Sequence, residues 1–263
     1  MAFTGKVALV TGGGSGMGQR AVERLAAQGA KVAALDINEA GLAATAASSD
    51  DIHTYTVDVT DTLAVADVVA KVEADLGPID RVMAAAGIMP TDRILDMDTA
   101  LIRKTMDVNF AGVVNVVKPT LPGMVERHRG DMVIFSSLQG HQPLSNQAAY
   151  CASKFAVKAF AEILAGEHPN SGIRFACVCP PAVNTPLVDQ LNAEAQSFLD
   201  LLPARTRLSP DRVLDAIERG LDKGKFWIMP GIARPAATYY RFFPGMFWKG
   251  IHKLEEKNRQ AAA

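Results

Sequence analysis

Short apolar runs alternate with longer amphipathic stretches along the first two thirds of the chain. The runs are rich in β-branched residues, as buried strands are, whereas the stretches between them repeat apolar residues at helical spacing. Strands are predicted at Lys6–Thr11, Lys31–Leu35, Thr54–Val59, Asp80–Ala85, Asp131–Ser136 and Gly172–Val178, and helices at Met17–Gln28, Asp61–Leu76 and Ala148–Glu167, with further helical sequence before the fifth strand.

This alternation predicts a single α/β domain in which helices flank both faces of a mostly parallel sheet. Right-handed crossovers make it a doubly wound, Rossmann-type fold, whose ligand crevice lies at the carboxyl ends of the strands. The regular alternation of strands and helices is lost beyond Pro180. There we expect a helix over Thr185–Leu202, a helix capped by Ser209 that ends near Asp222, and a last strand at Phe226–Met229.

Composition narrows the class of protein. Of the 263 residues 49% are hydrophobic and 21% are charged, and 27 basic residues balance 28 acidic ones. Such a chain can bury a substantial core, and its near-neutral charge gives no reason to expect a nucleic-acid partner. No apolar run is long enough to span a bilayer, and the first residues lack an export signal. Only three cysteines are present (Cys151, Cys177 and Cys179), so we expect no disulfide scaffold and a cytoplasmic protein.

A glycine-rich segment, from Thr11 to Gly18, follows the first predicted strand and opens the first predicted helix. Glycines let the backbone approach a pyrophosphate closely, and the start of a helix offers free N–H groups, so this context predicts a dinucleotide site. Asp36 ends the next strand, where a carboxylate accepts both adenosine ribose hydroxyls and repels a 2'-phosphate. The segment carries no Arg or Lys, so we predict NAD rather than NADP. A helix cap near Asn38 is compatible with that role of Asp36.

Several motifs follow in order: Asp58-Val59, Asn109, Ser137, and Tyr150-Cys-Ala-Ser-Lys154, with the serine 13 residues before the tyrosine. Together with the glycine segment, this set resembles the short-chain dehydrogenase/reductase family, from Thr11 to Thr185. The resemblance implies an oxidoreductase that transfers a hydride between NAD(H) and a secondary alcohol or ketone. It also implies a homotetramer.

The chemistry of the last motif explains its spacing. Tyr150 and Lys154 lie four residues apart on a predicted helix and so share one face. The lysine ammonium and the positive nicotinamide ring are expected to lower the pKa of the Tyr150 phenol toward neutral pH, which allows it to move a proton. Ser137 is expected to hold the reacting oxygen, and Lys154 the nicotinamide ribose. By resemblance, Asn109 supports a proton-relay water near the lysine.

The resemblance also implies a set of cofactor contacts, in which Asp58 meets the adenine amine and Thr185 meets the nicotinamide carboxamide. The residues predicted to bind NAD are Gly12, Ser15, Gly16, Met17, Gly18, Asp36, Asp58, Val59, Ala86, Gly87, Tyr150, Lys154, Val183 and Thr185. Two places depart from the family pattern. Ala84-Ala85-Ala86-Gly87 replaces the usual Asn-Asn-Ala-Gly, and Pro180-Pro181 replaces Pro-Gly, which stiffens the loop beside the nicotinamide.

Candidate substrate contacts follow from the resemblance alone: Met89, Gln139, His141, Leu144, Leu187, Val188 and Leu191. Their mixture indicates a mainly apolar alcohol or ketone, with His141 as a wall of the pocket. Cys177 and Cys179 alternate with Phe175 along a strand, which indicates buried core, and the five histidines are scattered. No metal site is therefore expected.

The C-terminal stretch is unusual in composition. Six of the 17 aromatic residues fall between Tyr239 and Trp248, and Arg234 to Gln260 holds six basic but only two acidic residues. We predict a catalytic domain over 1–233 and, over 234–263, an extension that packs on it. The aromatic and basic composition of 234–260 suits a membrane surface, a subunit interface or a lid over an apolar pocket, as well as an ordinary packed tail.

A second class of function remains open on the sequence, namely a non-catalytic NAD-sensing or scaffold protein with the same fold. Loss of Tyr150 or Lys154 would have favoured it, and both are present. Enoyl reduction is disfavoured, because the resembling enoyl reductases place six residues rather than three between the tyrosine and the lysine.

Overall fold

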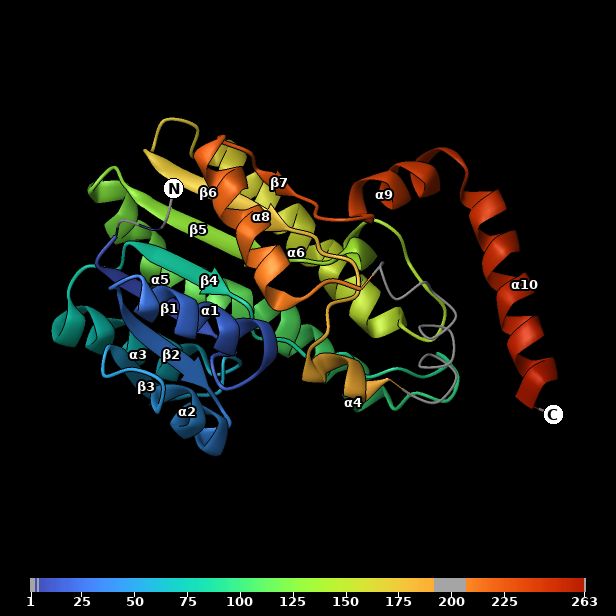
Figure 1. The fold of residues 1–263 in the computed structure, drawn as a ribbon, viewed down its shortest axis with the longest axis horizontal. Helices are drawn as coiled ribbons and strands as arrows, with labels where there is room; N and C mark the ends of the chain where they lie inside the picture. The colour runs from blue at the N-terminus through green and yellow to red at the C-terminus, as the bar shows by residue number, and fades with distance from the viewer. Residues whose placement is uncertain (1–2, 4, 192–206, 263) are drawn as a thin grey trace.

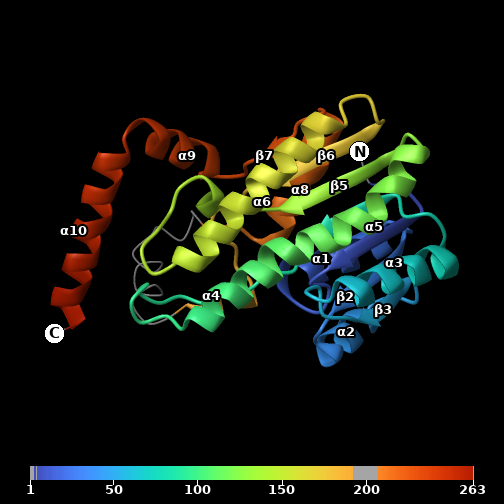
Figure 2. The same ribbon diagram turned by 180° about the vertical axis from the view of Figure 1, so that it is seen from behind.

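The computed structural model describes residue 3, residues 5–191 and residues 207–262, with side chains as far as residue 256. Its centre is a seven-stranded, all-parallel sheet with the strand order β3-β2-β1-β4-β5-β6-β7 (Figures 1 and 2). The strands are β1 Val7–Thr11, β2 Lys31–Asp36, β3 Ile52–Thr56, β4 Arg81–Ala84, β5 Gly130–Phe135, β6 Ile173–Val178 and β7 Trp227–Ile228. The predicted doubly wound fold is confirmed.

Helices cover both faces of the sheet, so each strand is buried on two sides. Along β1, Ala8 and Val10 belong to one apolar core, whereas Val7 and Leu9 belong to the other. This explains why the strands are continuous apolar runs rather than alternating ones. The first core packs against α1 Gly16–Ala27, α2 Glu39–Ala46 and α8 Pro210–Asp222, and the second against α3 Thr62–Leu76, α5 Gly112–Glu126 and α6 Ala148–Glu167.

Two predicted elements differ from the structure. The third strand was expected at Thr54–Val59, but β3 ends at Thr56, because its partner β2 ends at Asp36, which is paired with Thr56. The Val57 N–H still donates to the Asp36 carbonyl at 3.0 Å, but β2 has no further residue with which the chain beyond Val57 could pair. The helix expected over Thr185–Leu202 begins instead as a short 3-10 turn, Pro186–Gln190, and residues 192–206 lie outside the described part of the chain.

The predicted cap of α8 is confirmed, because the Ser209 hydroxyl accepts a hydrogen bond from the Arg212 N–H. The strand order reverses between β1 and β4, which opens a crevice at their carboxyl ends. Near this crevice the chain forms α4 Thr99–Met106 and then a π-helical turn, Asp107–Ala111, before α5 begins. Such turns are rare and are often found at functional sites.

A buried ion-pair network ties three strands together at the opposite, amino-terminal edge of the sheet. Arg81, fully buried at the start of β4, donates to Asp131 of β5 at 2.7 Å and to Glu218 of α8 at 2.6 Å. Arg174 of β6 donates to the same Asp131 at 2.6 Å. Arg81 and Asp131 are paired out of water, whereas Arg174 is partly exposed, and the network lies away from the crevice.

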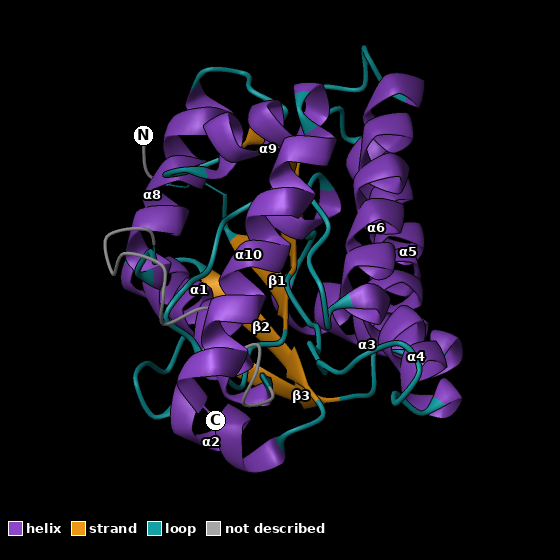
Figure 3. Cartoon of the chain, turned by 90° about the vertical axis from the view of Figure 1, so that its right-hand side faces the viewer, coloured by secondary structure: helices purple, strands orange, loops and turns teal. Residues whose placement is uncertain are grey.

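The chain ends in two helices, α9 Ala233–Phe242 and α10 Pro244–Ala262. Figures 1 and 3 show α10 lying across the carboxyl ends of the strands. None of the helices in the described part of the chain has the length and apolar character needed to cross a membrane.

Candidate active site

The loop between β1 and α1 is shaped by glycines that no other residue replaces without strain. Gly12 and Gly16 have φ angles of 73° and 55°, in the left-handed region that favours glycine. A Cβ on Gly18 would lie 2.1 Å from the Gly12 carbonyl oxygen. The side chain of Ser15, which precedes α1, does not cap the helix, so its first N–H groups remain available to an anion.

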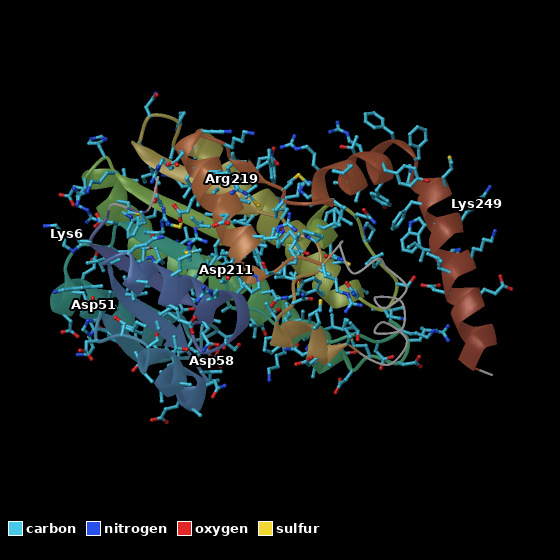
Figure 4. The ribbon with its side chains drawn as sticks, in the orientation of Figure 1. Lys6, Asp51, Asp58, Asp211, Arg219 and Lys249 are labelled. Atoms are coloured by element: carbon cyan, nitrogen blue, oxygen red, sulfur yellow. The ribbon has the colours of Figure 1, made fainter. Side chains whose placement is uncertain are left out.

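Asp36, at the end of β2, lies beside this loop, and two backbone hydrogen bonds orient its carboxylate. One oxygen accepts from the Gly14 N–H at 2.9 Å and the other from the Asn38 N–H at 2.9 Å. Asp58, placed near the end of β3 (Figure 4), is oriented in the same way by the N–H and hydroxyl of Thr60. Both carboxylates therefore have a fixed direction before any ligand binds.

The loop and the two aspartates border a groove of about 360 Å³. The predicted contacts that line it are Gly12, Ser15, Gly16, Met17, Gly18, Asp36, Asp58, Val59, Ala86, Gly87 and Thr185. The lining also includes Ile37, Lys104, Val108 and Gln190, which sequence reasoning missed. Ile37 could have been found from its position, because it follows Asp36 directly in the sequence. These features fit a dinucleotide. The uncapped start of α1 and the glycine loop can hold its pyrophosphate, and the oriented Asp36 carboxylate can accept hydrogen bonds from its ribose.

A second cavity, of about 320 Å³, adjoins the groove and contains the predicted chemistry. Ser137, Tyr150 and Lys154 line it together with the predicted cofactor contact Val183. The residues that border both hollows are Met17, Ala85, Gly87, Thr185 and Leu187. A ligand in the groove can therefore reach the side chains of α6 without leaving the protein.

Burial dominates the electrostatics of Tyr150. Burial raises the pKa of Tyr150 to about 12, and only a hydrogen bond with Ser137 acts to lower it. The Lys154 ammonium lies 5.7 Å from the centre of the tyrosine ring and donates to the Phe135 carbonyl at 2.9 Å. The predicted lowering of this pKa also requires the positive nicotinamide ring, so it stays a prediction for the enzyme with its cofactor.

Ser137 and Asn109 occupy different kinds of environment. The Ser137 hydroxyl, at the end of β5, donates to the Gln139 side-chain oxygen at 2.5 Å. Asn109, in the π-helical turn, is fully buried, and its amide bonds both backbone groups of Ile88 and the Ser153 hydroxyl. In the described part of the chain Asn109 borders neither hollow. Its hydrogen bonds fix the loop after β4 against α6, and its support of a proton-relay water stays a prediction.

Six of the seven predicted substrate contacts line the second cavity, namely Met89, Gln139, Leu144, Leu187, Val188 and Leu191. The prediction for His141 is wrong. Its ring stacks edge-on against Trp227, with centroids 5.3 Å apart, and is not among the described residues that line the cavity. The 3-10 turn Leu138–Gly140 directs it away, because residues 137 and 141 no longer share a helical face.

Sequence reasoning named no individual residue of the C-terminal helices as a cavity contact. The lining contributed by this part of the chain consists of Ile232, Ala236, Phe247, Ile251 and Leu254. A signal was present, because Phe247, Ile251 and Leu254 are spaced four and three residues apart, as on one face of a helix.

The burial of Lys154 should make the free energy of unfolding depend on pH. Burial lowers its pKa from 10.5 to about 8. Between these values the unfolded chain binds more protons than the folded one, so the free energy of unfolding rises with pH. From pH 7 to 9.5 we expect Lys154 to add about 2 kcal/mol. Urea unfolding of the wild type and Lys154→Met checks this, since the variant should lack the rise.

The exposed lysine Lys71 offers the matched control. Lys71→Met should leave the wild-type dependence of unfolding on pH unchanged. Parallel curves for the wild type and Lys154→Met would contradict the burial of the Lys154 charge.

Comparisons with known proteins agree with this geometry. Residues 6–196 match the model of the short chain dehydrogenase family, and the chain belongs to that family. A 2-dehydro-3-deoxy-L-rhamnonate dehydrogenase (NAD(+)) from Sphingomonas sp. is 33% identical over 77% of this chain and 81% of its own length. The 17-beta-hydroxysteroid dehydrogenase 13 of Rattus norvegicus is 30% identical over 95% of this chain and 83% of its own. The crystal structure of levodione reductase superimposes with a TM-score of 0.81 at 27% identity, covering 90% of this chain and 100% of that one.

Family membership confirms three predictions from the sequence. The protein is an enzyme, it is an oxidoreductase that transfers a hydride between NAD(H) and an alcohol or ketone, and its cofactor is NAD.

Proposed function

We propose that the enzyme interconverts a neutral, mainly apolar secondary alcohol and its ketone in the second cavity, with Tyr150, Ser137 and Lys154 as its chemical groups. One observation carries the proposal. The three side chains line a single, largely apolar cavity that is continuous with the glycine-loop groove through Met17 and Gly87. A substrate oxygen at the catalytic end and a cofactor along the groove therefore meet.

Each residue has a distinct part in the proposed reaction. Bound NAD supplies the hydride acceptor at the substrate carbon. In alcohol oxidation the Tyr150 phenolate oxygen takes the proton from the alcohol oxygen, and in the reverse direction the Tyr150 phenol returns it to the ketone oxygen. The Ser137 hydroxyl turns from Gln139 to bond the same oxygen and stabilises its developing charge. Asn109 is a positioning residue that holds the loop after β4 against α6.

Lys154 has two proposed tasks. With its pKa at about 8, its ammonium is largely protonated at neutral pH even though it is buried. The Phe135 carbonyl holds the amine at the cavity wall, where its remaining N–H groups can bond the nicotinamide ribose. Because the buried phenol has a pKa of about 12 in the chain alone, the positive charge of the bound nicotinamide, added to that of Lys154, is needed to bring it toward neutral pH.

The lining of the cavity supports a neutral substrate. Among its described lining residues the only charged one is Lys154, so a substrate carboxylate has no second cation to pair with. The acid in the name of the Sphingomonas relative is therefore a poor guide to this chain. The steroid in the name of the rat relative is closer in polarity, and that relative aligns with more of the chain.

Asp36 is the proposed determinant of NAD over NADP. Its carboxylate borders the groove, and a 2'-phosphate there would be repelled by about 1–3 kcal/mol. Asp36→Asn removes the charge at nearly constant shape, so the ratio of kcat/KM for NAD to that for NADP should fall about tenfold or more. Asp51→Asn, an exposed carboxylate before β3 (Figure 4), is the matched control and should leave the ratio unchanged. An unaltered ratio in Asp36→Asn would refute the assignment.

An absorbance screen for NADH tests the proposed activity. It should include aliphatic, aromatic, sterol and acyl-chain secondary alcohols with NAD, and the matching ketones with NADH. We expect turnover with neutral apolar members and none with hydroxy acids of similar size. Preference for a hydroxy acid would contradict the proposed substrate class. NAD binding without turnover of any member of the screen would also contradict the proposed substrate class.

Further proposals concern the whole molecule. We infer that residues 1–233 form the catalytic domain and that residues 234–263 are an extension packed on it, supported by the cavity lining that α10 provides. A cytoplasmic location is supported by three free, buried thiols. A homotetramer is supported by exposed apolar residues on α6, of which Ile163 is 61% exposed. Peripheral contact of residues 234–260 with a membrane completes the proposal.

A further inference from the structure

Helix α10 has an inner face that belongs to the substrate cavity. Phe247 and Ile251 are only 8% and 6% exposed, and with Leu254 they line the cavity that also contains Tyr150 and Ser137. Figure 3 shows the helix in front of the strand ends. One wall of the cavity is therefore formed by α10, an amphipathic helix at the surface that lies far along the chain from the catalytic motif.

The corner between α9 and α10 exposes large apolar side chains next to that wall. Phe242 is 67% exposed, Met246 60%, Phe243 52% and Tyr239 42%. They fall within eight consecutive residues, at the end of the molecule away from β3 and α2 (Figures 1 and 2). Single exposed apolar residues are common, but a cluster of this size, next in the chain to residues that line an apolar cavity, marks an interaction surface.

The charge around this corner has one sign. Arg234, Arg241, Lys249 and Lys253 are all exposed, and no acidic residue occurs between residues 234 and 254. Lys249 points away from the body of the protein in Figure 4. Apolar and aromatic tips framed by cations match a surface with an apolar interior and anionic headgroups.

A second copy of the chain is a poorer occupant. In a two-fold dimer the same patch meets itself, so the Arg241 and Lys249 of one subunit would approach those of the other with no acidic partner between residues 234 and 254. An anionic surface instead offers these cations the opposite charge and an apolar interior for the exposed side chains.

We propose that the α9–α10 corner binds the surface of an anionic bilayer and that the enzyme takes its apolar substrate from that bilayer along the inner face of α10. Binding places Phe242, Phe243 and Met246 among the acyl chains. Met246 lies on α10, the helix whose Phe247 and Ile251 form a wall of the cavity. The route of uptake rests on the proposed function, whereas attachment to the bilayer does not.

Co-sedimentation of the full-length protein with vesicles tests the attachment. The vesicles contain phosphatidylcholine alone or with about 30% phosphatidylserine, at low and high salt. The wild type should pellet with the anionic vesicles and be released as salt rises. The variant Phe242→Ser/Phe243→Ser/Met246→Ser should partition at least about tenfold more weakly. The control Leu63→Ser/Ile94→Ser/Leu95→Ser removes comparably exposed apolar residues elsewhere and should pellet like the wild type.

Activity then tests the uptake route. None of the three replaced corner residues lines the cavity, so the corner variant should keep wild-type kcat/KM toward a short, water-soluble secondary alcohol. Toward a long-chain alcohol carried in anionic vesicles its rate should fall by about tenfold, in step with its partition.

Three results would overturn the proposal. They are absence of wild-type pelleting, equal pelleting of the corner variant, and a dimer in gel filtration that only the corner variant loses. The first would remove the membrane and the last would assign the corner to a second copy. Failure of the proposed function has a different signature, namely vesicle binding that persists while no alcohol gives NADH.

Discussion

Replacing Tyr150 with phenylalanine is expected to lower kcat by on the order of a thousandfold, because the change removes the hydroxyl that moves the proton and keeps the buried ring. NAD affinity should change by less than about threefold, since the glycine loop and Asp36 are untouched. Steady-state rates of NADH formation with an alcohol from the screen, together with titration of NAD by fluorescence, measure both quantities.

The control for this variant is Tyr55→Phe. The Tyr55 hydroxyl lies 3.4 Å from Asp75 at the surface, remote from the cavity. That variant should turn over like the wild type. If Tyr150→Phe retained a rate within a few-fold of the wild type, another group would have to move the proton.

A methyl group at Gly18 is expected to disrupt the nucleotide groove. Its Cβ would lie 2.1 Å from the Gly12 carbonyl oxygen and 2.6 Å from the carbonyl carbon, both of which are backbone atoms that move only with the loop. We expect Gly18→Ala to weaken NAD binding by about a hundredfold or more, because the shifted loop no longer presents its N–H groups to the pyrophosphate. Isothermal titration with NAD gives the affinity, and thermal unfolding shows whether the chain still folds.

Gly166→Ala provides the comparison. Gly166 also lies in a helix, but a Cβ there meets nothing within 4 Å. This substitution should preserve NAD affinity and leave the unfolding temperature unchanged or slightly raised. Wild-type affinity in Gly18→Ala would mean that the loop yields easily and that the glycine is not needed for close approach.

The parts of the fold that depend on local pattern were predictable from the sequence. Strands buried on both faces, such as β1 and β2, are continuous apolar runs, and Ser209 caps its helix with its own side chain. The end of β3 was not predictable in this way. Val57 and Val59 favour a strand as strongly as the residues before them, and only the length of β2 determines where pairing stops.

In the candidate site, too, features that depend on local spacing were predictable and features that depend on tertiary packing were not. Motif residues with fixed spacing, such as Tyr150 and Lys154, were placed correctly in one cavity, because helix geometry puts them on one face. The pKa of Tyr150 was not predictable, because it depends on burial by residues from many elements. His141 was misplaced because it was assigned to the pocket from the family resemblance alone, whereas the chain forms a 3-10 turn before it and its ring packs against Trp227.

The contribution of α10 illustrates the limit of local reasoning. Its composition already indicated a surface or a lid, but composition does not say which side of the helix faces the protein. Only the three-dimensional path of the chain brings Phe247 and Ile251 back to a cavity whose chemistry is set about 100 residues earlier.

Stability and ligand binding depend on opposite edges of the sheet. The ion pairs of Arg81, Asp131, Arg174 and Glu218 stabilise the amino-terminal edge, whereas the loops at the carboxyl edge are proposed to bind the ligands. Substitutions at Leu187, Val188 or Leu191 should therefore change the shape of the cavity without breaking these ion pairs. The architecture makes this chain a promising starting point for laboratory evolution toward new alcohols.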